Sequence, residues 1–391
     1  MKKNEFYFHG NFGLERETLR VSADGRLAQT PHPFGDDPHI TRDFCENQIE
    51  LITPVCHTIG EAVSALGRLA KSVEEKLAQN GERIWLYSNP PHFETEADIP
   101  IAAFGGDQSS KRDYRENLQR RYGKRLMLFS GVHFNFSFAD ELLREWHKDS
   151  ELSYRDFTDS LYLRLYKQLC RYSWLPVLLT AVSPWYDKSL DGDHLSGVGR
   201  SRYSSMRNSE RGYWNEFVPL MDHSSLSAFT ESIENYVKKG MLFSASELYL
   251  PIRLKPRGVN TISALTQGGV DHIELRMFDL NPFTEFGVDE NDLTFAHLLI
   301  LWLLTLEDTE YTHAEQKAAV RDHRNAALYD LQGVNIDSTP IIDRAREILD
   351  EMKAHFSDEP KALAVIAYEL DKLDNKRLCE RLAAKDIYSL E

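Results

Sequence analysis

The segment Gly13-Leu14-Glu15-Arg16-Glu17-Thr18-Leu19-Arg20 decides the fold, because as a β-strand it would sort its side chains onto two faces. Side chains two positions apart on a strand share a face, at a separation of about 7 Å. Glu15 and Glu17 therefore point to the same side. The segment predicts a strand that presents two carboxylates on one face.

Three further segments, 133–138, 272–277 and 246–254, separate an apolar face from a polar one in the same way. The polar faces carry His133, Asn135, Ser137, His272, Glu274, Arg276, Glu247, Tyr249 and Arg253. For any one strand, a polar face that meets water is the simpler interpretation. The residue types favour a shared site instead, because solvated strand faces are typically rich in Lys, Thr, Ser and Gln.

Outside these strands, apolar stripes at helical spacing predict helices over 61–79, 157–181, 288–306, 311–330, 339–356 and 359–373. Asn80-Gly81 is a typical left-handed helix stop. No linker, low-complexity tract or fixed repeat is visible. We therefore expect an α+β fold in one catalytic domain, residues 1–391. Residues 1–305 would hold the sheet and active site, and residues 306–391 a helical tail.

The chain has 391 residues with 46 Lys+Arg and 61 Asp+Glu, a net charge of −15. This charge argues against nucleic acid or an anionic membrane as the main partner, because both attract clustered positive charge. The apolar run from Leu293 to Leu306 is too short to span a bilayer and predicts a buried helix. Met1 to Phe6 leads into no signal-peptide core.

The four cysteines, Cys45, Cys56, Cys170 and Cys379, form no CxxC pair. Their wide spacing is typical of neither a disulfide framework nor a zinc ribbon, and indicates a reducing compartment. Cys45 and Cys56 are interpreted as small core residues. Together with the absence of a signal-peptide core, these features predict a cytoplasmic protein.

The polar faces would form an unusual pocket if the strands curved together. It would hold Glu15, Glu17, Asp43, Glu50, Glu274 and His133. Packing so many carboxylates costs several kcal/mol unless cations neutralise them. Hard oxygen ligands select magnesium or manganese over zinc. Arg207, Arg253 and Arg276 could then bind phosphate and carboxylate groups, which suits an ATP-dependent reaction on an anionic substrate.

The familiar nucleotide-binding motifs are missing from the sequence. It contains no GxxxxGK[ST], and Gly197-Val198-Gly199 is followed by Arg202 where a dinucleotide fingerprint needs glycine. GxSxG and HExxH motifs are also absent. An ATP site would have to be built from metal ions and the sheet.

Four blocks of the sequence, 13–21, 41–55, 130–137 and 273–283, resemble bacterial glutamate–cysteine ligases. Weaker matches, in the same order, are Tyr114-Arg115, 205–213 and 247–253. The resemblance covers roughly residues 11–305. It implies a curved, half-open antiparallel sheet, similar to the catalytic domain of glutamine synthetase, with helices packed outside. It also implies ATP-dependent ligation of the γ-carboxylate of L-glutamate to the amine of L-cysteine, the first step of glutathione biosynthesis.

The resemblance also assigns roles to individual residues. The implied metal ligands, for Mg²⁺ or Mn²⁺, are Glu15, Glu17, Asp43, Glu50, His133 and Glu274. Arg276 and Arg207 would anchor glutamate or phosphate, and Arg253 would contact a phosphate of ATP. Tyr114, Tyr213 and Tyr249 would line the cysteine pocket. Glu46 and Glu247 are expected to be ordinary polar residues.

Two departures from the family leave alternatives open. The stretch between Tyr213 and Tyr249 and the helical tail are shorter than in the enterobacterial type, which leaves the acceptor pocket and oligomeric state open. A second, ATP-grasp domain is missing, so the chain is not expected to make glutathione by itself. The alternatives are a ligase of the same fold for another amine, a catalytically silent regulatory homologue and a metal-dependent hydrolase.

Overall fold

The computed structural model describes residues 8–104 and 109–385. Residues 1–6, which are expected to lack a signal-peptide core, fall outside these ranges. The described residues have the expected α+β organisation. Among the described residues, none of the helices combines the length and apolarity needed to cross a membrane. The Leu293–Leu306 run contributes to a buried helix, as expected.

A seven-stranded antiparallel sheet forms the centre of the molecule, in the order β2-β3-β1-β5-β9-β8, with β4 paired to β1. Its strands are β1 (Asn11–Ser22), β2 (Ile40–Arg42), β3 (Gln48–Ile52), β4 (Glu82–Ile84), β5 (Val132–Ser137), β8 (Ile252–Lys255) and β9 (His272–Phe278). Among the described strands, β2 and β8 are not paired to each other, so the sheet stays open. β6 (Trp185–Asp187) and β7 (Val198–Arg200) form a separate ribbon.

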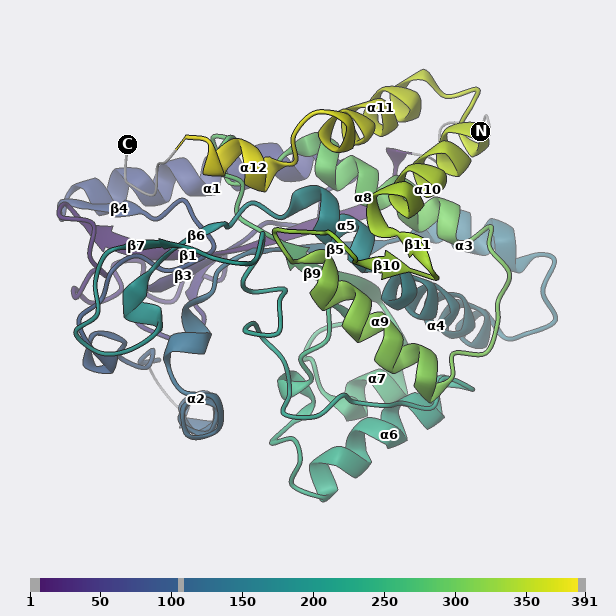
Figure 1. Ribbon diagram of the computed structural model, residues 1–391. Coiled ribbons are helices and arrows are strands. Elements are labelled where there is room, and N and C mark those ends of the chain that lie inside the picture. Colours follow the sequence, from purple (N-terminus) through teal and green to yellow (C-terminus); the bar gives the residue numbers. More distant parts are fainter. Residues whose placement is uncertain (1–7, 105–108, 386–391) are drawn as a thin grey trace.

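Helices cover the apolar face of this sheet. In Figure 1, α1 and α8 lie above the sheet and α2 lies on the opposite side. Phe12, Phe134 and Phe136 form the centre of the core, where the Phe12 ring lies 5.9 Å from Phe134 and 5.6 Å from Phe136. The helices are α1 (Ile59–Ala78), α2 (Ser109–Tyr122), α3 (Asp140–His147), α4 (Tyr154–Tyr172), α5 (Trp174–Thr180), α6 (Leu226–Lys238), α7 (Ile262–Gly268) and α8 (Glu290–Leu303).

The predicted tail is mainly helical, with α9 (His313–Ala326), α10 (Ile341–His355), α11 (Pro360–Asp374) and α12 (Leu378–Ala383). Its helix predictions are confirmed to within a few residues. The short hairpin of β10 (Asn335–Ile336) and β11 (Thr339–Pro340), and α12, were not predicted. The hairpin carries the positive φ angles of Asp337 (47°) and Ser338 (70°), which a tight turn requires.

Two of the predicted elements are wrong in part. The helix expected over 157–181 is divided into α4 and α5, because Pro176 cannot donate a helical hydrogen bond and its ring crowds the preceding turn. The strand expected over 246–254 begins only at Ile252. Residues Ala245–Glu247 form a 3₁₀ turn, and Leu248, Tyr249 and Leu250 are all buried instead of alternating.

The four cysteines are free thiols. Cys45, Cys170 and Cys379 are buried, and Cys56 is half-buried. Burial raises the pKa of Cys45, with a smaller contribution from Asp43. An inert core role for Cys45 agrees with its prediction.

Candidate active site

The register of β1 places acidic side chains beside partners on both neighbouring strands. Glu17 lies directly opposite Glu50 in the β1–β3 pair. Glu15 lies directly opposite His133 in the β1–β5 pair. Directly opposed residues of an antiparallel pair have Cβ atoms about 4.5–5.5 Å apart. The sheet register alone therefore gathers four of the predicted ligands.

The strands on the other side of β5 extend this polar face. Glu274 of β9 lies opposite Asn135 of β5 and Arg253 of β8. The β5–β9 register shifts between Val132 and Phe134, so one additional residue of β9 is accommodated there. Such bulges are frequent beside active sites. Beside this bulge, Arg276 Nη1 lies 3.3 Å from His133 Nδ1 and donates to Glu274 Oε1 at 2.8 Å.

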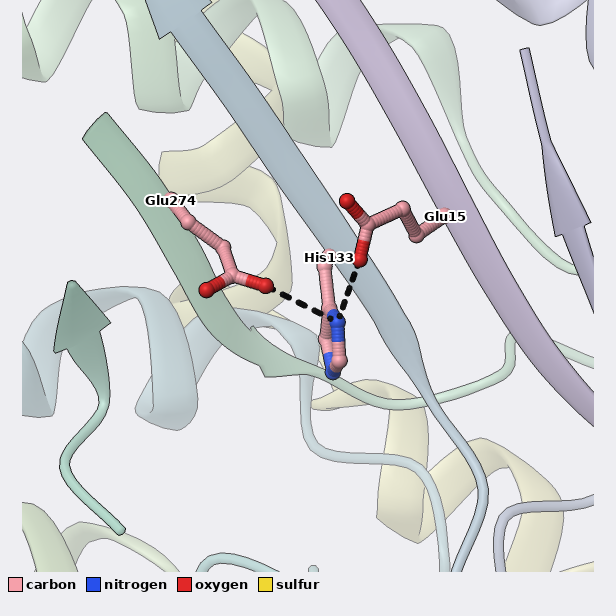
Figure 2. Close-up of side chains that lie close together, drawn as sticks. All are labelled: Glu15, His133 and Glu274. Carbon is pink, nitrogen blue, oxygen red and sulfur yellow. Dashed lines mark hydrogen bonds and ion pairs between the residues drawn. The ribbon is translucent and has the colours of Figure 1, made fainter. Parts of the chain in front are cut away.

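His133 is the centre of the cluster (Figure 2). Its Nδ1 lies 3.2 Å from Glu15 Oε2 and 3.3 Å from Glu274 Oε1, and its Nε2 lies 3.5 Å from Glu17 Oε1. One ligand atom each of Glu15, His133 and Glu274 fall within 4.8 Å of one another. His133 and Glu274 are buried, at 2% and 0% exposure. The three side chains come from three adjacent strands, so their spacing is set by the sheet.

This cluster fits a hard divalent cation. Within the described residues, buried Glu17 Oε2, His133 Nε2 and Glu274 Oε2 have no hydrogen-bond partner. Buried polar atoms without partners are rare in proteins and are often explained by a ligand or ion. Carboxylate oxygens with a single imidazole are donors that Mg²⁺ and Mn²⁺ accept. Glu15, Glu17, His133 and Glu274 therefore form a candidate metal site.

The electrostatic cost of the cluster appears in the pKa values of its members. Burial, with repulsion from Glu15, Asp43 and Glu17, raises the pKa of Glu50 well above its usual value. Burial likewise raises the pKa of Glu17. Burial by itself would lower the pKa of His133, but Glu17, Glu15 and Glu274 outweigh it and the pKa is raised. The positive charge of a bound cation would offset the repulsion between the carboxylates.

The pKa of Glu274 shifts in the opposite direction. Burial alone would raise it, but Arg276 and Lys255 hold the pKa of Glu274 well below its usual value. In return, and against the effect of burial, the neighbouring carboxylates raise the pKa of Arg276. The ion pair is therefore fully charged at neutral pH, and Arg276 stays available as a fixed positive group.

The cluster forms part of the lining of a cavity of about 210 Å³. The predicted residues in its lining are Glu15, Glu17, Asp43, Glu50, Tyr114, His133, Tyr213, Tyr249, Arg253, Glu274 and Arg276. Glu46 and Glu247 are not in the lining. The structure thus brings eleven of the twelve predicted site residues to one cavity, with carboxylates and tyrosines on its walls.

Arg207 is the predicted residue that does not line this cavity. Its Nη1 donates to the backbone carbonyls of Arg276, at 2.8 Å, and Phe278, at 3.1 Å. Its guanidinium packs on Gly131, where a Cβ would lie 2.3 Å from Arg207 Cζ, so a larger residue at this position would displace the guanidinium. Arg207 is still close enough to Glu17 to oppose part of the rise that burial causes in the pKa of that carboxyl.

The guanidinium of Arg253 also bonds to backbone. Its Nε and Nη2 donate to the carbonyl of Leu248, at 3.2 and 3.0 Å, and Nη2 donates to the carbonyl of Ser246 at 2.9 Å. Burial and the neighbouring Arg276 lower the pKa of Arg253. Arg253 therefore adds positive charge to the cavity while it supports the loop before β8.

Two cations of the lining, Lys255 and Arg115, were given no role from the sequence. Lys255 Nζ lies 3.6 Å from Glu274 Oε2. Arg115 donates to the carbonyl of Asp43, and its Cζ lies 4.5 Å from the ring centre of Phe104. Lys255 follows Arg253 by two residues, so strand alternation was a usable signal. Arg115 belongs to the Tyr114-Arg115 match with the family, which is the signal that sets it apart from the other arginines of α2.

A second cavity, of about 410 Å³, adjoins the first. Glu15 lines both cavities. The second cavity is bordered by Asn135 and Ser137 of β5, by the exposed Val55 and by Arg257. Glu15 therefore lies between two cavities, one rich in tyrosine and charged residues and one more apolar.

Comparison with known proteins identifies the family. The family model described as glutamate-cysteine ligase matches residues 1–242 and 237–326. A glutathione biosynthesis bifunctional protein of Clostridium perfringens is 35% identical over 402 residues, which is 95% of this chain and 51% of that protein. A glutamate–cysteine ligase of Clostridium acetobutylicum is 32% identical over 370 residues, covering 82% of this chain and 76% of that enzyme.

A solved structure has the same fold. The crystal structure of the Francisella tularensis glutamate–cysteine ligase in complex with AMP matches with a TM-score of 0.84 and 25% identity, covering 97% of this chain and 85% of that one. The expected fold class is thereby confirmed. The chain spans about half the length of the bifunctional relatives it matches. The family model and the C. acetobutylicum enzyme together show that this chain belongs to the glutamate–cysteine ligase family.

Proposed function

We propose that this protein joins the γ-carboxylate of L-glutamate to the amine of L-cysteine, with ATP and Mg²⁺, to give γ-glutamylcysteine, ADP and phosphate. The observation that carries this proposal is the cluster of Glu15, Glu17, His133 and Glu274 beside Arg276. Carboxylates that need cations and a fixed guanidinium suit phosphoryl transfer to an anionic substrate. Membership of the family supports the same reaction.

The chemistry proceeds in two steps. An oxygen of the glutamate γ-carboxylate attacks the γ-phosphorus of ATP, the bond to ADP breaks, and an acyl phosphate forms. The cysteine amine then attacks the acyl carbon, phosphate leaves, and the amine gives up a proton. When bound, Mg²⁺ would neutralise charge on the transferring phosphoryl group.

The chain's own residues would hold the reactants. Arg276, charged and fixed by Glu274, is positioned to bind a carboxylate or phosphate. Tyr114, Tyr213 and Tyr249 would surround the acceptor and exclude water from the acyl phosphate. Burial raises the pKa of all three tyrosines, so each hydroxyl keeps its proton at neutral pH.

The nucleotide would occupy the second cavity. Glu15 lines both cavities, so a metal ion held by Glu15, His133 and Glu274 would supply positive charge for the phosphates of a nucleotide in the second cavity. A volume of about 410 Å³ is in the range of small-molecule sites. The apolar Val55 and the amide of Asn135 suit a purine base, and the exposed Arg257 suits phosphate. The AMP complex of the F. tularensis relative is consistent with nucleotide binding in this fold.

The deciding experiment incubates the purified protein with ATP, Mg²⁺ and L-glutamate, with and without L-cysteine. Phosphate release and γ-glutamylcysteine are measured together, the dipeptide by mass spectrometry. Cysteine-dependent phosphate matched one-to-one by dipeptide is the expected result. Phosphate release without dipeptide would redirect the search to other amines, and no ATP turnover with any amine would overturn the proposal.

A site variant tests the cluster directly. Glu15→Gln keeps the shape of the side chain but removes its charge, so ligation should fall by at least about 100-fold. Glu231→Gln, an exposed glutamate on α6, is the matched control and should behave as wild type. Near-normal turnover of Glu15→Gln would remove the acidic cluster from the mechanism.

A further inference from the structure

The three tyrosines of the cavity lie on segments that are not strands of the central sheet. Tyr114 lies on α2, Tyr213 lies in the loop that follows Arg207, and Tyr249 lies in the loop before β8. Yet the rings of Tyr213 and Tyr249 are 5.9 Å apart, and all three side chains line one cavity. Some contact outside the sheet must fix these three segments relative to one another.

Glu247 makes the central contact. Its side chain is fully buried, at 0% exposure, although no apolar or metal-binding role explains a carboxylate there. Glu247 Oε1 accepts hydrogen bonds from Arg121 Nη1 and from the Tyr122 hydroxyl, both at 2.7 Å. Glu247 Oε2 accepts from the backbone N–H of Phe243. The carboxylate therefore joins the end of α2 to the loop that carries Tyr249.

Arg121 also binds the backbone of the loop that leads to Tyr249. Arg121 Nη1 donates to the carbonyl of Met241 at 2.6 Å, and its Nη2 donates to that of Gly240 at 3.1 Å. The Tyr122 ring packs edge-on against Tyr249, with centres 5.5 Å apart. Burial and the bond to Glu247 raise the pKa of Tyr122 to about 12, so its hydroxyl remains a donor at neutral pH.

Asn215 connects the third segment. Its Nδ2 donates to the backbone carbonyl of Glu247 at 2.7 Å and to the Tyr122 hydroxyl at 3.2 Å. Its Oδ1 accepts from the backbone N–H of Tyr249 at 2.9 Å. Asn215 follows Tyr213 by two residues and is 5% exposed. All three tyrosine-bearing segments thus meet at one buried hydrogen-bond network.

Resting on the proposed function, we propose that Glu247 is a positioning residue for the amine acceptor, because its carboxylate joins α2 to the Tyr249 loop and, through the Tyr122 hydroxyl and Asn215, also anchors the Tyr213 segment. It acts through Arg121, Tyr122 and Asn215 and does not touch the substrates. Charge-assisted hydrogen bonds are the stronger class, so their loss should loosen the acceptor pocket while the sheet-borne cluster keeps its geometry.

The kinetic test compares Glu247→Gln with Glu82→Gln. Glu82 is a matched control, because it is also buried (3% exposed) and ion-paired to an arginine, Arg20, at 2.7 Å, away from the cavity. Glu247→Gln should raise the KM for the acceptor amine about tenfold, the effect of losing one charge-assisted hydrogen bond. The KM values for ATP and glutamate should stay nearly unchanged. Glu82→Gln should lower Tm without altering the ratio of these KM values.

Amide hydrogen exchange provides a readout that needs no turnover. In Glu247→Gln, exchange should accelerate in residues 240–250, including the Tyr249 amide, and in residues 213–215, but not in β1, β5 or β9. Glu82→Gln should leave these two segments protected. If wild type forms no product with any amine, the proposed function fails while exchange still decides the positioning role. Equal rises in all three KM values, or unchanged exchange in residues 240–250, would overturn the inference.

Discussion

Glu50→Gln should stabilise the metal-free protein and weaken its response to magnesium. Glu50 lies directly opposite Glu17 in the β1–β3 register, and repulsion from Glu15, Asp43 and Glu17 adds to its burial. Glutamine keeps the volume of the side chain but removes one negative charge. The substitution therefore relieves the repulsion that a cation would otherwise neutralise.

The expected gain in stability follows from the distance between the Glu17 and Glu50 side chains. Opposed side chains have Cβ atoms about 5 Å apart, and two unit charges at this distance repel by about 3 kcal/mol at an effective dielectric constant near 20. Lys255 offsets part of this repulsion. We expect a gain of about 1–3 kcal/mol at pH 8, which corresponds to a rise in Tm of about 1–4 °C for a chain of 391 residues.

Thermal unfolding in EDTA and in excess MgCl₂ measures both effects. Wild type should gain Tm with Mg²⁺, because ligand binding to the folded state stabilises it. Glu50→Gln should start higher in EDTA and gain less, whereas Glu231→Gln should follow wild type. A lower Tm of Glu50→Gln in EDTA, or an equal gain of both proteins with Mg²⁺, would refute the reasoning.

Three further predictions address other residues. Arg276→Lys keeps the charge but loses the planar fork, so kcat should fall by about 100-fold in a phosphate-release assay; wild-type turnover would contradict this role. Tyr249→Ala should raise the KM for cysteine far more than that for glutamate, and an equal rise in both would exclude Tyr249 from the acceptor pocket. Burial raises the pKa of Glu369 to about 8, although Lys372 at 2.8 Å opposes this. A carboxyl with a raised folded-state pKa stabilises below its unfolded value of 4.5, and this stability is lost as pH rises through 8. Tm measured from pH 5 to pH 9 should therefore fall less steeply in Glu369→Gln than in wild type, and parallel profiles would count against the shift.

Much of the fold could be predicted because local periodicity reports burial. The alternation of β5 and β9 identified Phe134, Phe136, Ile273 and Leu275 as the apolar face, and each is fully buried. The helical stripe over 61–79 corresponds to α1, which ends just before Gly81, at a φ of +70°. These patterns are local, since a strand or helix exposes its faces in the same order wherever it is placed.

The errors arise where long-range contacts override local pattern. Residues 246–251 alternate in sequence, but Arg121 and Tyr122 of α2, more than a hundred residues away, hold Glu247 and keep this segment out of the sheet. A second contact without a local signal is that of Arg207, whose guanidinium bonds to the backbone of β9, while its role in binding glutamate or phosphate stays a prediction. Neither contact has a signal in its own segment.

The sequence by itself determined which residue types share a face. In 133–138 and 272–277, polar and charged residues lie on one side and aromatic and aliphatic residues on the other, and in 13–20 Glu15 and Glu17 share one side. Only the tertiary structure decided which of them meet. Strand order and register set the neighbours of Glu15, Glu17 and His133, and the bulge in the β5–β9 pair accompanies the contact of Arg276 with His133. The physical reason is that side chains alternate between the two faces of a strand, so a short segment of sequence shows which residues share a face. Pairing between strands depends on packing across the whole chain.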